Sequence, residues 1–238
     1  MGPNGYTKEP RGNRLAPASA VAVDVALFTI QDASLRVLLV KRGAPPFRGA
    51  WSLPGGFVRR DESVDEAALR ELQEETSIRT VYLEQLYTFG ELDRDPRGRV
   101  ISVSYYAVVH QERSRISAGQ QIAGAKWFAV HRLPALAFDH REIVHAALER
   151  LRNKVNYTSV AFQLLPKKFA LSELQRAYEV ILGQRLDKRN FRKKMLQLGM
   201  LRDTHEQRAE GRQRPARLYA FPEARVIKLQ EKGIIVPF

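Results

Sequence analysis

The chain has 238 residues, of which 44% are hydrophobic, and it contains no cysteine. This length is comfortable for two domains, and the composition is that of a globular protein that can bury a core. The lack of cysteine excludes disulfides and cysteine-ligated zinc, and it fits a reducing cytoplasm. No run approaches the roughly eighteen apolar residues of a membrane-spanning helix, so we expect no membrane partner.

The net charge of +13 is unevenly distributed along the chain. Residues 153–238 contain 18 Lys and Arg against 8 Asp and Glu, whereas the first 152 residues contain 21 against 18. Such asymmetry between parts of a chain indicates that the basic part meets a polyanion.

The first two thirds of the chain predict a lead-in followed by an α+β domain. Residues 1–20 are rich in Gly, Pro and polar side chains, and we expect them to be disordered. The predicted strands are Val21–Ile30, Leu35–Arg42, Trp51–Leu53, Val81–Phe89, Val100–Val109 and Lys126–Val130, and the predicted helices are Ser63–Thr76 and His140–Arg152. This order predicts a mixed sheet over residues 21–152 with helices packed on its faces.

The last third changes to a pattern of short helices. The polar segment 153–158 is expected to link the first domain to a second one over residues 159–238. A helix is predicted at Ser172–Leu182, with Ser172 and Gln175 as a capping box and Gly183 as its stop. Two strands, Met200–Thr204 and Ala216–Phe221, are predicted around a basic loop.

A second helix in this region, Lys188–Leu198, is capped by Asp187 and begins with a hydrophobic staple of Leu186 and Phe191. Its polar face carries the side-chain types that contact phosphates and base edges in a major groove: Lys188, Arg189, Asn190, Arg192, Lys193, Lys194 and Gln197. Cations in its first turn oppose the helix dipole, which suits a helix that meets phosphate. We expect a winged helix-turn-helix, with wing contacts from Arg208, Arg212 and Arg214. The alternative is a solvated basic helix in an ordinary helical domain.

Three carboxylates on the earlier predicted helix indicate a pyrophosphate site. Glu71, Glu74 and Glu75 lie within roughly 100° of arc, since an α-helix has 3.6 residues per turn. Like charges this close destabilise a bare helix, and a divalent cation with oxygen ligands, Mg²⁺ or Mn²⁺, resolves the repulsion. The alternative is a solvated acidic face.

The whole pattern resembles the Nudix box: Gly56, Glu62, Arg70, Glu71, Leu72, Glu74, Glu75 and Ile78. The resemblance implies a Nudix α/β/α sandwich and a catalytic set of Glu62, Arg70, Glu71, Glu74 and Glu75. It also implies metal ligation by the three glutamates and the carbonyl of Gly55, and an Arg70 that holds Glu62 or orients the carboxylates. Ser77 stands where the family has a glycine in a left-handed turn, so we expect a slightly different helix end and a retained site.

The charged loop from Asp93 to Arg99 is similar to the one in ADP-ribose pyrophosphatase relatives within the Nudix group. This similarity implies a nucleotide-sugar ligand, with Arg97 and Arg99 as binding residues. The alternative is a solvated charged hairpin. The trio His140, Glu142 and His145 is interpreted as surface or linker-facing helix residues rather than a metal site.

The combination of the two domains resembles the NrtR regulators, Nudix-related transcriptional factors of bacterial NAD metabolism. The stretch from Leu186 to Lys194 is similar to the DNA-binding part of that family. The resemblance implies a dimer that binds double-stranded DNA at a palindromic operator, represses NAD-related genes and responds to ADP-ribose. The other hypothesis is a working Mg²⁺-dependent ADP-ribose pyrophosphatase, because the carboxylate set is complete.

Overall fold

The computed structural model describes residues 19–78, 81–114, 124–156, 160–209 and 215–222. Residues 1–18, expected as a lead-in, lie outside this part of the chain, as do Arg212 and Arg214. In the described part, no helix is long and apolar enough to cross a membrane.

A seven-stranded mixed sheet forms the first domain, in agreement with the sequence. Its order is β3 (Trp51–Ser52), β2 (Ser34–Lys41), β1 (Ala20–Gln31), β6 (Val100–Val108) and β5 (Tyr82–Phe89), while β4 (Gly55–Phe57) pairs with β1 and β7 (Ala125–Ala129) with β2. Only the pairing of β1 with β6 is parallel. The sheet is therefore mixed, as the order of predicted elements requires.

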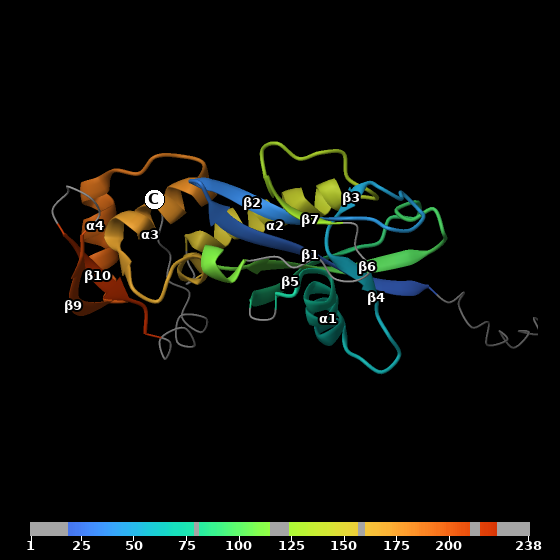
Figure 1. Cartoon of the computed structure of the whole chain (residues 1–238), viewed down its shortest axis with the longest axis horizontal. Coiled ribbons are helices and arrows are strands. Elements are labelled where there is room, and N and C mark those ends of the chain that lie inside the picture. Colours follow the sequence, from blue (N-terminus) through green and yellow to red (C-terminus); the bar gives the residue numbers. More distant parts are fainter. Residues whose placement is uncertain (1–18, 79–80, 115–123, 157–159, 210–214, 223–238) are drawn as a thin grey trace, which may run out of the picture.

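Two helices cover the two faces of this sheet (Figure 1). Side chains along β1 alternate between them, because successive strand residues point to opposite faces. Val23, Val25 and Leu27 pack with the buried residues of α1 (Val64–Thr76), whereas Ala26 and Phe28 pack with those of α2 (His140–Val155). The predicted α/β/α sandwich is confirmed.

The second domain is a small winged helix. It contains a 3₁₀ helix, η2 (Val160–Leu164), two α-helices, α3 (Leu171–Leu182) and α4 (Lys188–Gln197), and a sheet in the order β8 (Phe169–Ala170), β10 (Ala216–Ala220) and β9 (Arg202–Arg208). Phe191 and Met195 of α4 are buried. The side chain of Asp187 accepts a hydrogen bond from the Asn190 backbone at 2.8 Å, so the predicted cap is confirmed.

One hydrophobic core joins the two domains. It runs from Phe28 in the sheet, through Leu151 and Val155 at the end of α2, to Leu174 of α3. The segment 153–158 therefore does not begin as a polar linker: α2 continues through Val155, which is fully buried. Burial of Val155, an apolar residue within a polar stretch, favours the continuation of α2 up to the second domain.

Two local predictions in the winged helix are wrong. The α3 helix begins after Ala170, and Glu173 rather than Gln175 accepts the N-terminal backbone bond, at 2.7 Å. Gln175 instead donates to the Leu186 carbonyl at 2.9 Å and so holds the turn between α3 and α4. Strand β9 extends to Arg208, beyond the predicted end at Thr204, because its polar residues pair with β10 although they bury little apolar surface.

Candidate functional site

Arg70 organises the carboxylates of α1. Its guanidinium donates to Glu62 at 2.6 and 2.8 Å, to Glu71 at 2.6 Å and to Glu74 at 3.4 Å. These bonds lower the pKa of Glu62 to about 2 and raise the pKa of Arg70. Arg59 also lies 3.3 Å from Glu74. Two arginines therefore already offset the repulsion that the sequence predicted among these carboxylates.

Glu75 has a different environment from the other glutamates. It accepts the backbone N–H of Gly55 at 3.0 Å, which ties α1 to β4. Burial raises the pKa of Glu75 to about 8, with further contributions from the nearby charges of Glu71 and Asp24. Burial therefore favours the protonated form of this carboxyl group, and a bound cation would favour the carboxylate.

The glycines beside α1 permit a very close approach of β4 to its neighbours. A Cβ atom on Gly55 would lie 2.2 Å from the Val23 carbonyl oxygen, and one on Gly56 would lie 2.2 Å from Glu71 Oε1. Glu71 and Glu75 thus both lie close to this turn, and the oxygen chemistry of carboxylates and a carbonyl suits a hard cation. In the described residues, however, no three His, Cys, Asp or Glu side chains are already gathered for a metal. Ligation by Glu71, Glu74, Glu75 and Gly55 stays a prediction.

The end of α1 differs from expectation. Ser77 adopts the left-handed conformation, with φ of 63°, so the helix ends as the glycine form would. Its N–H still donates to the Gln73 carbonyl at 2.9 Å, and the following N–H of Ile78 donates to the Thr76 hydroxyl at 3.2 Å. Burial of Ile78 and these bonds hold Ser77 in a conformation that costs about 1–2 kcal/mol.

A cavity of about 180 Å³ adjoins this carboxylate helix. It lies where β1, β4, the loop before β6 and the start of α2 meet. The residues that line it are Ala22, Asp24, Arg42, Leu53, Gly55, Gly56, Phe57, Arg94, Asp95, Arg97, Val100, Phe138 and His140. Sequence patterns predicted Arg97 and the two glycines, but neither Arg42 nor Phe138.

The loop before β6 is not a solvated hairpin. Arg94 and Asp95 are 7% and 5% exposed. Arg94 donates to Asp139 at 2.7 and 2.8 Å and lies 3.4 Å from Asp24. Arg97 lines the cavity, whereas Arg99 donates to the Gly90 carbonyl and is not among the lining residues. The loop thus places one of its two predicted ligand residues in the cavity.

His140 is buried, which corrects its interpretation as a surface residue. Its Nδ1 accepts the backbone N–H of Leu53 at 2.8 Å, and its Nε2 faces Asp24 at 3.3 Å. Burial lowers the pKa of His140, and the hydrogen bond at Nδ1 requires the neutral ring. The imidazole therefore ties the start of α2 to the cavity floor without carrying charge.

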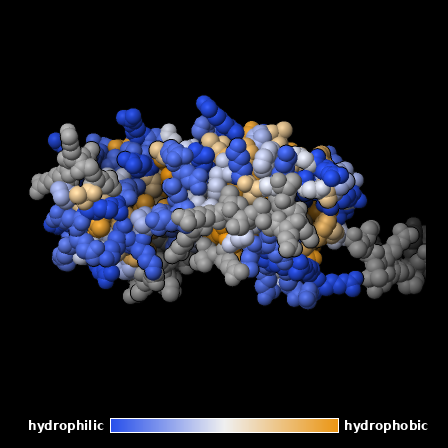
Figure 2. Space-filling view, viewed as in Figure 1, coloured by the Kyte–Doolittle hydropathy of each residue, from blue (hydrophilic) through white to orange (hydrophobic). Residues whose placement is uncertain are grey.

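The winged helix presents a basic surface around α4. Its exposed polar residues are Lys188, Arg189, Asn190, Arg192, Lys193 and Gln197, whereas Lys194 is half-buried. Within the described part of the chain, the cationic side chains among these six residues form no ion pair with an acidic group. Figure 2 shows the visible face at this end of the molecule as mostly hydrophilic. Arg208, expected in the wing, pairs with Glu173 of α3.

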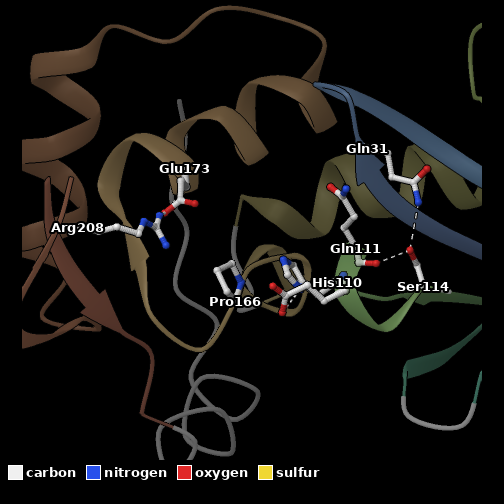
Figure 3. Close-up of a pocket in the computed structure, with 8 residues that line it drawn as sticks. Gln31, His110, Gln111, Ser114, Pro166, Glu173 and Arg208 are labelled. Carbon is white, nitrogen blue, oxygen red and sulfur yellow. Dashed lines mark hydrogen bonds and ion pairs between the residues drawn. The ribbon is translucent and has the colours of Figure 1, made fainter. Parts of the chain in front are cut away.

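A larger groove of about 580 Å³ separates the winged helix from the end of the sheet (Figure 3). Glu173, Arg208 and Pro166 line it on one side, and His110, Gln111, Glu112, Ser114 and Gln31 on the other. Its polar groups largely satisfy one another: Arg208 pairs with Glu173, and Gln31 donates to Ser114 at 3.1 Å. We assign no ligand to this groove.

The fold and the two surfaces define a Nudix domain joined to a DNA-binding winged helix. The NUDIX domain model matches residues 19–147, and the NrtR DNA-binding winged helix domain model matches residues 161–221. The chain is 37% identical over 209 residues to the "ADPR responsive transcriptional repressor NtrR" of Acinetobacter baylyi, covering 86% of this chain and 83% of that protein. The chain belongs to the NrtR family of Nudix-related transcriptional regulators.

Solved structures agree with this assignment. The crystal structure of Shewanella oneidensis NrtR complexed with a 27mer DNA matches with a TM-score of 0.75 and 40% identity, covering 85% of this chain and 93% of that one. The NUDIX domain of the same protein complexed with ADP ribose matches with a TM-score of 0.50 and 38% identity, covering 61% and 94%. The Nudix part is also 40% identical over 131 residues to an ADP-ribose pyrophosphatase of Methanocaldococcus jannaschii, covering 55% of this chain and 74% of that protein.

Proposed function

We propose that this chain is a DNA-binding transcriptional repressor of NAD biosynthesis and salvage genes, which senses ADP-ribose through its Nudix domain. The observation that carries the proposal is the course of α2. Its first residue, His140, lines the cavity beside the carboxylate helix, and its last turn is buried against the winged helix. A single helix thus reaches from the cavity to the winged helix, and Figure 1 shows α2 running along the sheet towards α3.

DNA binding is assigned to the exposed face of α4. A helix of this kind lies in the major groove with its N-terminal residues towards the bases. One α4 helix covers only a few base pairs, so we propose a homodimer that places two such helices on a palindromic operator. Light scattering of the full chain, alone and with operator DNA, tests this assembly: two chains per DNA duplex support it, and one chain contradicts it.

ADP-ribose is assigned to the cavity beside α1. The family relationship and the ADP-ribose complex of the related NUDIX domain support this ligand. Mg²⁺ held by Glu71, Glu74, Glu75 and the Gly55 carbonyl would supply a bridge to phosphate oxygens and a bound water of lowered pKa. The chain's own contribution is to hold these carboxylates through Arg70 and to place the cavity next to them.

Hydrolysis of ADP-ribose is the second candidate function, because all the carboxylates of the Nudix box are present. We place it below sensing, since the relative that matches 86% of this chain is named a transcriptional repressor. Incubation of the full chain with ADP-ribose and Mg²⁺ or Mn²⁺, followed by assay for AMP and ribose 5-phosphate, tests for this turnover, which does not exclude sensing. Product that disappears in Glu75→Gln supports turnover, whereas lack of product at high protein concentration excludes it.

The experiment that tests the proposed function is a gel shift on candidate promoter DNA of NAD-related genes, with and without ADP-ribose. We expect a specific complex whose affinity changes in the presence of the ligand. A chain that binds ADP-ribose but shows the same affinity for promoter and unrelated DNA would not be a regulator.

A further inference from the structure

Three arginines line the cavity beside α1, and they differ in how far their charges are already matched. Arg94 has Asp139 at 2.7 Å, and Arg97 has Asp95 at 2.6 Å. Arg42 has no ion-pair partner among the described residues. Its one hydrogen bond there from the guanidinium runs from Nε to the Pro46 carbonyl at 2.8 Å, which leaves both terminal nitrogens without an acceptor.

The Arg42 side chain is nevertheless held in a defined position. Its guanidinium carbon lies 4.7 Å from the centre of the Phe138 ring, and that of Arg97 lies 5.8 Å from the same ring. Arg97 also lies 4.8 Å from the centre of the Phe57 ring. These contacts form a wall of aromatic rings and guanidinium groups, Phe57, Arg97, Phe138 and Arg42, which we call the arginine wall.

The backbone at Phe138 supports a functional role for this wall. Phe138 has a φ of 52°, in the left-handed region that bulky residues rarely adopt. That conformation is strained, and strain of this kind clusters at ligand sites. The consequence here is that the ring lines the cavity and meets two cations. An edge contact with Phe47, with ring centres 4.9 Å apart, fixes the ring from another side.

The guanidinium groups of Arg42 and Arg97 repel each other, and their contacts with the Phe138 ring offset only part of this repulsion. The positive charge of Arg97 contributes to a lowered pKa of Arg42, after the larger effect of burial. An anion that accepts hydrogen bonds from the free nitrogens of Arg42 would remove this penalty. A guanidinium fork suits phosphate oxygens, since it can donate two parallel hydrogen bonds.

We infer that Arg42 is the residue that binds the diphosphate of the nucleotide-sugar ligand, with Phe138 and Pro46 as its positioning partners. The identity of the whole ligand rests on the proposed function. The assignment of Arg42 as an anion-binding residue does not depend on it. Arg42 offers the ligand donors that Arg97 lacks, because Asp95 already accepts hydrogen bonds from two nitrogens of the Arg97 guanidinium. It also lies outside the Nudix box, so the carboxylate pattern does not reveal it.

Calorimetric titration of the full chain with ADP-ribose, adenosine and inorganic pyrophosphate tests this inference. Arg42→Ala should weaken ADP-ribose binding by about tenfold or more, the size of a lost charge-assisted hydrogen bond. Arg42→Lys should lie between the wild type and Arg42→Ala, since lysine keeps the charge but loses the fork. Adenosine binding should be unchanged in both variants. Arg48→Ala is the matched control, because Arg48 is an exposed arginine of the same loop that does not line the cavity.

The outcomes separate the two proposals. If the wild type binds ADP-ribose and Arg42→Ala binds it equally well, the assignment of Arg42 is overturned while the proposed function stands. If the wild type does not bind ADP-ribose, the proposed function fails, and pyrophosphate decides on Arg42. Binding of pyrophosphate that is lost in Arg42→Ala supports the anion site, and equal or undetectable binding in both proteins overturns it.

Discussion

Arg152 of α2 donates a hydrogen bond from Nε to the backbone carbonyl of Ile181 of α3, at 3.1 Å. This bond crosses between the two domains at the far end of the helix that begins at the ligand cavity. Lys154, also near the end of α2, pairs with Glu84 of the sheet at 2.6 Å. The helix is therefore fixed both to the sheet and to the winged helix, which is what a mechanical link between two sites requires.

Arg152→Ala should reduce the coupling between ADP-ribose and DNA while leaving each site able to bind. Mutations at such junctions change coupling by about 0.5–2 kcal/mol, so the effect of ADP-ribose on DNA affinity should fall several-fold. DNA affinity measured by fluorescence anisotropy, with and without saturating ADP-ribose, gives the coupling directly. Arg141→Ala on the same helix serves as control, because among the described residues its side chain donates only to the Pro134 carbonyl. Unchanged coupling in Arg152→Ala would remove this contact from the link.

Arg189→Ala and Lys193→Ala should each weaken binding to operator DNA and leave ADP-ribose binding intact. Both side chains are exposed on α4 and are candidates for phosphate or base contacts. Loss of one phosphate contact should lower the slope of log affinity against log salt by about one. Gel shifts over a series of salt concentrations measure this slope, with Arg60→Ala in the first domain as control. Full operator affinity in both variants would exclude α4 as the recognition helix.

The contribution of His140 to stability should fall as the pH is lowered below about 6.5, while Glu75, whose pKa burial raises to about 8, should act in the opposite direction over the same range. The folded protein lowers the pKa of His140, so the unfolded chain binds more protons at this residue in that window and its contribution to stability rises with pH. His140→Asn keeps an acceptor for the Leu53 N–H but cannot titrate. Stability at pH 5 relative to pH 7, measured by urea unfolding, should be higher in the variant than in the wild type. An identical difference in both would mean that His140 is not a neutral buried ring.

Gly55→Ala should destabilise the protein by about 1–3 kcal/mol, the usual range for overpacking. The added methyl group would meet the Val23 backbone oxygen at 2.2 Å, and a backbone atom in a sheet cannot move aside as a side chain can. Gly90→Ala is the matched control, since the nearest atom to its Cβ would lie 3.8 Å away. Thermal unfolding compares the three proteins. Equal stability of the two variants would show that β4 does not need a glycine at this position.

The sequence predicted the parts of this protein that depend on local patterns. The β-branched and apolar residues of β1 identified that strand, and Asp187 identified the start of α4. Glu71, Glu74 and Glu75 were found because their spacing is local. Strand β9 was too short in the prediction because its residues are polar. The end of α2 was missed because burial of the single apolar residue Val155 extends the helix through a polar stretch.

The cavity could be predicted only in part. Arg42, Phe138 and Asp24 come from distant segments, and no spacing along the chain shows that they meet. The burial of Arg94 and His140 likewise depends on partners that the fold supplies, Asp139 and Leu53. The left-handed backbone that places Phe138 in the cavity is likewise a property of the fold, and the sequence does not show it.

We propose that one chain couples an ADP-ribose cavity to a DNA-binding helix. Titration of operator DNA with the full chain, at zero and saturating ADP-ribose, tests it most directly. We predict that the ligand changes DNA affinity by about fivefold or more, and that DNA changes ADP-ribose affinity by the same factor, since coupling is reciprocal. A chain that binds both partners, with each affinity unchanged by the other, would contradict the account.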